Sequence, residues 1–370
     1  MHKVVISGYY GFNNIGDESI LRAVVDNLRR KLNPIDITVL SQMPELTSEK
    51  FGVHSVYRMD VLKVIKAIGS SDLLISGGGS LLQDATSKKS ISYYLGVIWI
   101  ALLLKKKVFI YSQGIGPISG KINRFLVKKT LNKIKYIVVR DEQSKELLCE
   151  IGVNYENIYV TADPVIRVKK AELETGMKIL ESEGFVKDTS KITVGFALRG
   201  LKIKGNFIDE ICEAAEHILS HYNAQIVFIP FHYNEDMGVI NEIKKKHGDK
   251  AFYIENKYLT EEMLSIIGNM DVLIGVRLHS LIYAAIMDVP MIAISYDPKI
   301  NSFMHSLEMK ALCSIYDFQS EFLIEEFNEV LKRSEAIRTK VQKNIEQLIL
   351  TLNKNEILIQ ELLGIGEDDR

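Results

Sequence analysis

Short apolar runs alternate with longer amphipathic segments along the first half of the chain. We expect the short runs to form strands and the segments between them, such as Ser19–Leu32 and Lys89–Leu104, to form helices. Strands that are apolar throughout and alternate with helices predict a mostly parallel sheet covered on both faces. The predicted strands are Val4–Ser7, Ile37–Leu40, Leu73–Ser76, Val108–Ser112, Tyr136–Val139 and Ile158–Val160.

The alternation stops at Ile166–Lys191, a charged stretch with one predicted helix, Ala171–Glu183, and then resumes. Two doubly wound sheets in tandem predict an α/β protein with two Rossmann-like domains, facing each other across a cleft at the carboxyl ends of their strands. We expect domains over residues 1–168 and 176–345, and a C-terminal helix over 346–370 that packs across the boundary. The second series of strands is Ile192–Leu198, Ile226–Phe231, Phe252–Ile254, Val272–Val276 and Met291–Ser295, and residues 321–363 are predicted to be helical.

The charge balance and the cysteines exclude several classes of protein. A net charge of −1 excludes a globally basic nucleic-acid-binding protein, so any anion site must be local. The three cysteines lie far apart, so neither a disulfide framework nor a metal site is expected. The longest apolar stretch, Tyr93–Leu104, is about half of the roughly 20 residues that span a membrane. Because Val4–Ser7 is interpreted as a strand and not as part of a signal peptide, we expect a cytoplasmic protein.

A glycine-rich segment, Gly8-Tyr-Tyr-Gly-Phe-Asn-Asn-Ile-Gly-Asp17, follows the first predicted strand. Its spacing matches neither the dinucleotide-binding fingerprint nor the P-loop. A tight turn with Asp17 as the helix cap explains the segment about as well as a binding loop does. The two asparagines next to an aspartate favour a loop that binds a polar ligand such as a sugar.

Two further loops follow predicted strands of the same sheet. Gly77-Gly-Gly-Ser-Leu-Leu-Gln-Asp84 would expose backbone N–H groups to an anion or a hydroxyl, and a flexible crossover turn is the alternative. Gln113-Gly-Ile-Gly-Pro117 is the third such loop. Since all three are expected at one edge of the sheet, we assign them to acceptor binding. The residues assigned are Gly11, Asn13, Asn14, Gly78, Gly79, Ser80, Gln83 and Gln113.

Cationic side chains follow the predicted strands of the second domain. Arg199 ends one strand, and Arg277-Leu-His279 ends another. If the backbone there is extended, Arg277 and His279 point the same way. A guanidinium beside an imidazole suits a small, highly charged anion such as a phosphate ester. A satisfied structural histidine is the alternative, but the adjacent arginine would be costly to bury without an anion.

Other charged residues at strand ends have ordinary explanations beside functional ones. Asp297 and Pro298 form a normal helix start, whereas the neighbouring Lys299 adds a third cation. Arg140, after a strand of the first domain, is expected to contribute to the same anion site. Groups expected to support the site are His232, Asn234 and Asp236, although a helix cap explains Asn234 equally well.

A basic segment runs from Lys105 to Arg140, with ten Lys and Arg residues and no Asp or Glu. Part of it is a predicted helix with Ile122, Phe125 and Leu126 on its other side. This pattern is typical of a segment that attaches to an anionic membrane surface, and a solvated basic face is the equally supported alternative.

Together these motifs resemble the polysaccharide pyruvyl transferase family, and within it the S-layer-associated branch of the CsaB type. The resemblance implies a GT-B-like fold, phosphoenolpyruvate as the donor co-substrate with no other cofactor, and phosphate as a product. It also implies a lipid-linked acceptor, an N-acetylmannosamine-containing disaccharide on a lipid diphosphate, that receives a cyclic 4,6-ketal. Arg277, His279 and Lys299 match positions that the family associates with the donor, and Arg199 is assigned with them. The segments that carry the resemblance are 7–17, 76–84, 113–117, 275–279 and 295–299.

The expected mechanism needs three kinds of group and no metal. Arg277, Lys299 and Arg199 would bind the carboxylate and phosphate of the donor. His279 would act as the general acid at the donor methylene carbon, and Asp17 as the base for an acceptor hydroxyl. Two other functions stay open at this point: a GT-B glycosyltransferase with a nucleotide-sugar donor, and a non-catalytic module that binds a glycan or an anion.

Overall fold

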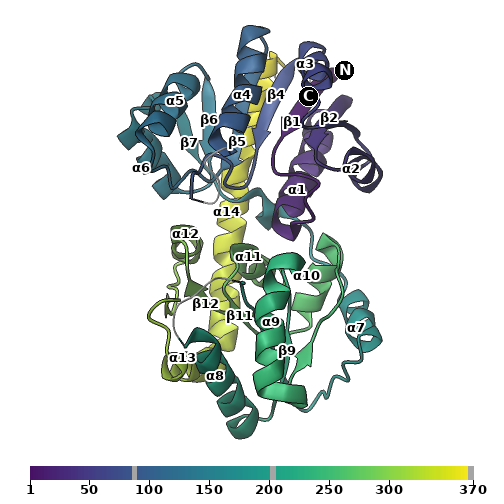
Figure 1. Ribbon diagram of the computed structural model, residues 1–370, viewed down its shortest axis with the longest axis vertical. Helices are drawn as coiled ribbons and strands as arrows, with labels where there is room; N and C mark the ends of the chain where they lie inside the picture. The colour runs from purple at the N-terminus through teal and green to yellow at the C-terminus, as the bar shows by residue number, and fades with distance from the viewer. Residues whose placement is uncertain (86–89, 201–205, 366–370) are drawn as a thin grey trace. The chain divides into compact units, whose positions relative to one another are not determined.

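The computed structural model of the protein describes residues 1–85, 90–200 and 206–365. It divides into two compact units, residues 1–168 with 348–370, and residues 169–347. We call them unit 1 and unit 2 and describe each by itself. Each unit contains one parallel β-sheet with helices packed against it (Figure 1).

Unit 1 contains a seven-stranded sheet in the order β3-β2-β1-β4-β5-β6-β7. The chain begins at β1, moves outward through β2 and β3, and returns on the other side of β1, where Val4 pairs with Leu73 of β4. This reversal is the topological switch point of a doubly wound sheet, beside which such sheets bind ligands. The strands are β1 His2–Ser7, β2 Ile35–Ser41, β3 His54–Tyr57, β4 Leu73–Gly77, β5 Lys107–Gln113, β6 Tyr136–Val139 and β7 Ile158–Val160.

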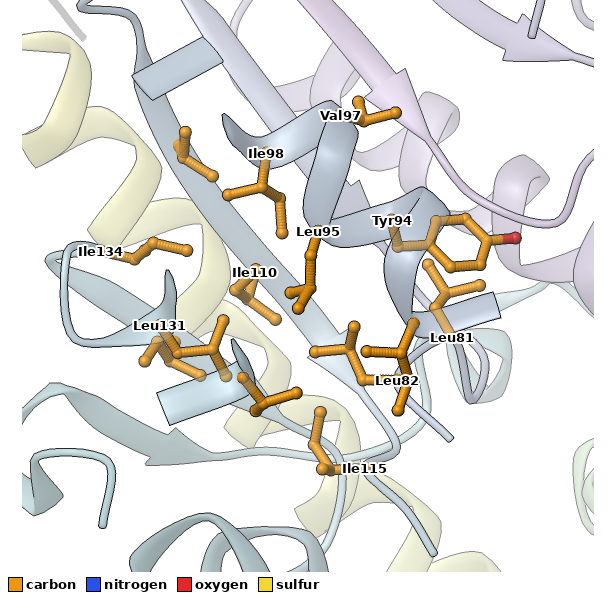
Figure 2. Close-up of a cluster of buried hydrophobic side chains, with 14 of the residues drawn as sticks. Leu81, Leu82, Tyr94, Leu95, Val97, Ile98, Ile110, Ile115, Leu131 and Ile134 are labelled. Atoms are coloured by element: carbon orange, nitrogen blue, oxygen red, sulfur yellow. The ribbon is translucent and has the colours of Figure 1, made fainter. Parts of the chain in front are cut away.

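The helices of unit 1 form two groups. Four of them bury apolar side chains on one face of the sheet, where Leu95 and Ile98 of α4 share a core with Ile110 of β5 (Figure 2). In the second group, Arg167 of η2 binds both Asn27 of α1 and Glu356 of α14. The first group is α3 Val61–Gly69, α4 Ser90–Leu103, α5 Lys121–Leu131 and α6 Glu142–Ile151; the other helices are α1 Ile15–Lys31, α2 Pro44–Phe51, η1 Tyr155–Asn157 and η2 Pro164–Arg167.

Unit 2 repeats this plan with a six-stranded sheet in the order β10-β9-β8-β11-β12-β13. Gly195 of β8 pairs with Val227 of β9 on one side and with Leu273 of β11 on the other. The switch point therefore lies between β8 and β11. The strands are β8 Ile192–Ala197, β9 Ala224–Phe228, β10 Phe252–Tyr253, β11 Val272–Gly275, β12 Met291–Ser295 and β13 Cys313–Ser314.

The helices of unit 2 include three that bury their apolar faces in one core with the sheet, namely α8, α9 and α13. The last helix, α14, has 30 residues, and its part up to residue 347 belongs to unit 2 while the rest belongs to unit 1. The helices are α7 Leu173–Ser182, α8 Phe207–His221, α9 Tyr233–His247, η3 Gly248–Lys250, α10 Thr260–Gly268, α11 Leu278–Ile286, α12 Pro298–Ser306, α13 Ser320–Lys332 and α14 Ser334–Leu363.

Side-chain caps begin several helices where the sequence offers an aspartate. Asp60 accepts from the N–H of Lys63 at 3.1 Å, and Asp141 accepts from the N–H of Ser144 at 2.7 Å. Each bond satisfies one of the four N–H groups that a helix leaves without an internal partner at its start. Local sequence thus fixes where α3 and α6 begin.

The predicted fold class, two Rossmann-like α/β domains with a helical C-terminal region, is confirmed. Two strands, β3 and β13, were missed because each is short and none of its residues is buried, so neither has an apolar run. The predicted C-terminal helical stretch is two helices, α13 and α14, that meet at Arg333. Lys89, the predicted first residue of α4, lies outside the described residues.

Candidate functional site

In unit 2 the predicted cations follow neighbouring strands. Arg199 follows β8, Arg277 follows β11 and Lys299 follows β12. Because all these strands are parallel, their carboxyl ends lie at the same edge of the sheet. The sheet order, with the switch point between β8 and β11, places two arginines where doubly wound sheets bind ligands.

The carboxylate of Asp236 bonds to the segments that follow three strands of unit 2, β8, β9 and β11. Its side chain is completely buried in the first turn of α9. Oδ2 accepts from the N–H groups of Phe231 at 3.1 Å and His232 at 2.7 Å, and Oδ1 accepts from the N–H of Gly200 at 3.1 Å. Arg277 donates through Nη2 to the same Oδ1. The segments that follow β8, β9 and β11 therefore meet on one carboxylate.

Arg277 is also bonded to Glu235, whose Oε2 lies 2.9 Å from Nη2. Burial alone would lower the pKa of Arg277, but the charges of Asp236 and Glu235 and the bonds to them raise it. Burial would raise the pKa of Glu235, but Arg277, followed by His232 and Arg199, lowers it. The protein itself supplies the anions that were expected beside Arg277, so the burial of this arginine does not by itself indicate an anionic ligand.

Tyr296, directly after β12, brings two of the predicted cations together. The guanidinium carbon of Arg199 lies 4.4 Å from the centre of the Tyr296 ring, and Nζ of Lys299 lies 5.6 Å from it. Lys299 also pairs with Asp297 at 3.3 Å, whereas Arg199 forms no ion pair with a carboxylate in the described part of the chain. The charge of Arg199 also lowers the pKa of Glu235, which is bonded to Arg277. The two arginines and the lysine therefore belong to one cluster.

His279 lies in the first turn of α11 and not in extended backbone. Arg277 is the N-cap, with φ −100° and ψ 128°, and the helix begins at Leu278. The hydroxyl of Ser280 donates to the carbonyl of Arg277 at 2.7 Å and closes this turn. The premise that both residues lie in extended backbone is therefore wrong, because only Arg277 is extended and His279 belongs to the helix.

In unit 1, helix α1 is capped by Asn14 and not by Asp17. The Asn14 side chain accepts from the N–H of Gly16 at 3.2 Å, so α1 starts at Ile15 and Asp17 lies in its first turn. Asn13 is exposed and has a positive φ of 58°. The prediction that Asp17 caps this helix is therefore wrong, because Asn14 is the N-cap.

Gly11 has a structural role in this loop. Its N–H donates to Oε1 of the buried Glu18 at 2.8 Å. Its φ is +77°, and a Cβ atom there would lie 2.3 Å from Oγ of Ser41. Burial raises the pKa of Glu18, while the bond from Gly11 and the charge of Lys50 oppose that rise. Only glycine fits this backbone.

The Gly77–Gly79 loop is packed tightly against α1. A Cβ atom at Gly78 would lie 1.9 Å from Cγ2 of Ile20, and one at Gly79 would lie 2.7 Å from Oδ1 of Asp17. The N–H of Gly78 donates to the carbonyl of Tyr111 at 3.1 Å. The structure thus brings Asp17 and Gly79 together. One N–H group of the expected anion cradle, that of Gly78, is already bonded to a strand residue.

Several polar side chains are buried at the carboxyl ends of β1, β4 and β5. Gln113 is completely buried, and its Nε2 lies 3.5 Å from Oγ of Ser76. Among the described residues, Oε1 of Gln113, Oγ of Ser7 and Oη of Tyr10 have no hydrogen-bond partner. Buried polar atoms are normally bonded, so this edge of unit 1 has the polar character of a binding site.

Arg140 is buried in unit 1, whereas Arg199, Arg277 and Lys299 belong to unit 2. Its Nη1 donates to Asp163 at 3.0 Å, its Nε lies 3.5 Å from Asp141, and its Nη2 donates to Ser80 at 3.1 Å. Two carboxylates therefore balance its charge, and Ser80 binds it. Gln83 lies partly buried in the same loop as Ser80.

Sequence reasoning gave no role to Glu235 or Tyr296 and named Asp236 only as a supporting group. The signal for the acidic pair was its place in the first turn of the helix that follows a buried strand. No sequence signal links Tyr296 to Arg199, because 97 positions separate them and only the sheet order brings them together.

Two negative findings apply to the described residues alone. None of the helices in that part of the chain is both long enough and apolar enough to cross a membrane. Across the same residues, no three His, Cys, Asp or Glu side chains are grouped so as to hold a metal ion.

A family model described as polysaccharide pyruvyl transferase matches residues 14–298, which include Arg199, Arg277 and the switch point of unit 2 and end one residue before Lys299. The chain belongs to the polysaccharide pyruvyl transferase family. It is also 21% identical to the amylovoran biosynthesis protein AmsJ of Erwinia amylovora, over 98% of this chain and 100% of AmsJ. Membership of this family makes the protein a transferase of polysaccharide biosynthesis.

Solved structures share the fold of this pyruvyl transferase family member at low identity. HepE of Anabaena, in complex with UDP and glucose, has a TM-score of 0.66 and 11% identity, covering 98% of this chain and 100% of HepE. UDP-GlcNAc 2-epimerase from Neisseria meningitidis has a TM-score of 0.64 and 15% identity, covering 99% and 100%. These likenesses establish a GT-B-type fold of two Rossmann-like domains.

Proposed function

We propose that the protein transfers a pyruvyl group from phosphoenolpyruvate to two hydroxyls of one sugar, forming a cyclic ketal and releasing phosphate. We assign the acceptor to an N-acetylmannosamine-containing disaccharide on a lipid diphosphate, made for a secondary cell-wall polymer as in the S-layer-associated branch. Membership of the pyruvyl transferase family supports the pyruvyl transfer. The branch and the acceptor rest on the sequence motifs.

The observation that carries the donor assignment is the placement of Arg199 and Lys299 around Tyr296. A donor with a carboxylate and a phosphate needs cations from more than one direction, and guanidinium groups suit both. Arg277 lies at the neighbouring strand end and is held by Asp236. We leave Arg140 out of the donor site because it belongs to unit 1, where Asp141, Asp163 and Ser80 hold its side chain.

The reaction needs one acid and one base. His279 donates a proton to the methylene carbon of phosphoenolpyruvate, and an acceptor hydroxyl oxygen bonds to the adjacent carbon. The bond from that carbon to the phosphate oxygen then breaks, phosphate leaves, and the second hydroxyl closes the ketal. The two sugar hydroxyls release one proton each, and Asp17 accepts the proton of the hydroxyl that attacks first. One of the two protons replaces the proton that His279 gave to the methylene carbon, and the other leaves with phosphate.

The acceptor assignment uses the polar edge of unit 1. Asp17 lies against Gly79, and Gln113 carries a buried carbonyl oxygen with no hydrogen-bond partner among the described residues. Such groups suit the hydroxyls of a sugar.

One assay tests the reaction directly. The protein is incubated with phosphoenolpyruvate and a synthetic lipid-linked disaccharide that contains N-acetylmannosamine, and released phosphate and glycan mass are measured. We expect equal amounts of phosphate and of a glycan heavier by one pyruvyl ketal. UDP-N-acetylglucosamine in place of phosphoenolpyruvate is the control, and transfer from it alone would contradict the proposal.

The role of His279 is tested with His279→Ala. We expect turnover to fall by about 10²–10⁴-fold, because general acid catalysis contributes that much, with the thermal unfolding midpoint unchanged. His221→Ala, on the exposed end of α8, is the matched control and should keep full activity. Full activity of His279→Ala would remove its role as the acid.

We also propose that unit 1 attaches to an anionic membrane surface from the cytoplasmic side. On α5, Ile122 and Phe125 expose 75% and 61% of their surface, and Lys121 and Lys128 are exposed beside them. On α3, which packs on the same core, Leu62 is 80% exposed. Apolar side chains ringed by cations suit an anionic bilayer. Liposome flotation tests this: recovery should require anionic lipid and fall in Phe125→Glu, and equal recovery without anionic lipid would contradict it.

A further inference from the structure

Arg58, one residue after β3, is surrounded by aromatic rings. Its guanidinium carbon lies 4.0 Å from the ring centre of Tyr93, 5.1 Å from that of Phe12 and 5.6 Å from that of Tyr94. These rings come from α4 and from the loop between β1 and α1. The side chain therefore lies at the carboxyl edge of the unit 1 sheet, with the loops assigned to the acceptor.

The backbone and the rings hold Arg58 in place. Its N–H donates to the carbonyl of Ser41 at 2.9 Å, and the Tyr93 hydroxyl donates to the Arg58 carbonyl at 3.1 Å. Phe12 in turn stacks on Tyr9, with 3.9 Å between the ring centres and an angle of 1°. Stacking engages the faces of a guanidinium, whereas its N–H donors point outward in its plane.

Among the side chains that the structure describes, Arg58 lacks the carboxylate partner that three other partly or fully buried arginines have. Arg140, Arg167 and Arg277 each pair with at least one carboxylate. Within residues 1–85, 90–200 and 206–365, Arg58 forms no such pair, and its buried Nη1 has no hydrogen-bond acceptor. A buried donor on a cation is costly to leave unbonded, so an anionic ligand is indicated.

Asp17 and Arg58 both affect the pKa of Tyr94. Burial raises the pKa of Tyr94; the charge of Arg58 opposes that rise and the charge of Asp17 adds to it. Both charges are therefore close to one tyrosine hydroxyl. A ligand with a sugar hydroxyl at Asp17 and an anionic group at Arg58 would match the two ends of this arrangement.

We propose that Arg58 binds a phosphate attached to the acceptor glycan, with the aromatic side chains Tyr9, Phe12 and Tyr93 forming the walls of that subsite. The inference rests on the proposed function, and it deepens it by assigning the side chain that recognises the phosphate of the acceptor, so that a glycosyl phosphate binds more tightly than a neutral glycan. The planar guanidinium fits two phosphate oxygens, and the acceptor is held by its charged end while its hydroxyls remain available to Asp17.

Calorimetric titration without phosphoenolpyruvate tests the subsite. The probes are N-acetylglucosamine 1-phosphate and neutral N-acetylglucosamine, titrated into the full-length protein and into Arg58→Gln. We expect the wild type to prefer the phosphorylated sugar, and the variant to lose about 10- to 100-fold of affinity for it, since a charge-assisted bond is lost. Affinity for the neutral sugar should not change.

Two further variants separate binding from folding. Lys66→Gln removes one exposed cation from α3, in the same unit, and should leave both affinities unchanged. Arg58→Lys keeps the charge but not the planar donor pair, so we expect an intermediate loss. If Arg58→Gln lowers the affinity for both sugars equally, or for neither, or if the wild type does not prefer the phosphorylated sugar, the proposal is overturned.

A vesicle arm identifies the source of the phosphate. If Arg58→Gln weakens binding to phosphatidylglycerol vesicles and leaves the sugar phosphate unaffected, the site serves a lipid headgroup and the proposal fails. Because these titrations contain no donor, they can succeed when pyruvyl transfer is not observed, and transfer can be observed when they fail. The two proposals are therefore tested separately.

Discussion

Arg277 and Asp236 form a buried ion pair on which the segments following three strands of unit 2 converge. The same carboxylate accepts backbone N–H groups from the segments after β8 and β9. The pair therefore holds together the loops that carry Arg199 and Arg277 through contacts within the protein. Four predictions follow from this and from three other contacts.

Asp236→Asn should destabilise the protein by about 3 kcal/mol, because it leaves the buried charge of Arg277 with one carboxylate instead of two. Chemical denaturation with both proteins measures the difference. Asp209→Asn is the control: this carboxylate is 60% exposed and pairs with Lys246, so its loss should cost less than about 1 kcal/mol. Equal costs for the two variants would show that Asp236 does not hold the loops.

Tyr296→Leu should raise the KM for phosphoenolpyruvate by roughly 3- to 30-fold, because a cation over an aromatic ring gains about 0.5–2 kcal/mol. The ring lies beside Arg199 and Lys299, which we assign to the donor. Tyr296→Phe keeps the ring and should stay within about twofold of the wild type. Steady-state kinetics with both variants decide this, and a similar rise in both would assign the effect to the hydroxyl.

Gly79→Ala should lower both stability and activity. Its φ is +74°, and the new Cβ would lie 2.7 Å from Oδ1 of Asp17, so the loop and the assigned base must move apart. Gly96→Ala, in the exposed part of α4 with nothing within 4 Å of its Cβ, should instead stabilise the protein by roughly 0.5–1 kcal/mol. Thermal unfolding and the transfer assay compare them, and normal activity of Gly79→Ala would separate Asp17 from this loop.

The buried Glu18 predicts a pH-dependent stability. Its pKa in the folded protein is raised above 4.5 by burial. The folded state therefore binds more protons than the unfolded state above pH 4.5, so stability falls as pH rises through the raised pKa. Glu18→Gln removes this fall, and its advantage over the wild type should grow with pH by at most about 1.4 kcal/mol per unit.

Denaturation at several pH values from 4 to 8 measures the effect of Glu18→Gln. Glu335→Gln, whose side chain is 84% exposed at the start of α14, is the matched control and should show no such trend. If the curves of the wild type and Glu18→Gln stay parallel, the carboxyl of Glu18 does not titrate in that range.

The sequence alone determined all strands except the short β3 and β13, their alternation with helices and the loops that carry polar residues. These depend on local patterns: an apolar run such as Leu73–Ser76 predicts a buried strand, and Asp297-Pro298 predicts a helix start that the structure confirms. Family membership followed from the same loops.

Only the tertiary structure decided which of these residues act together. Arg277 and Asp236 are 41 positions apart, and their pairing requires the order of β8, β9 and β11 in the sheet. The same order sets Arg199 over Tyr296, while the start of α11 at Leu278 places His279 in a helix and not in the extended backbone that was predicted. Local patterns record which side chains are buried, but contacts between distant segments depend on how the strands assemble, and that assembly assigned carboxylate partners to Arg277 and an aromatic enclosure to Arg58.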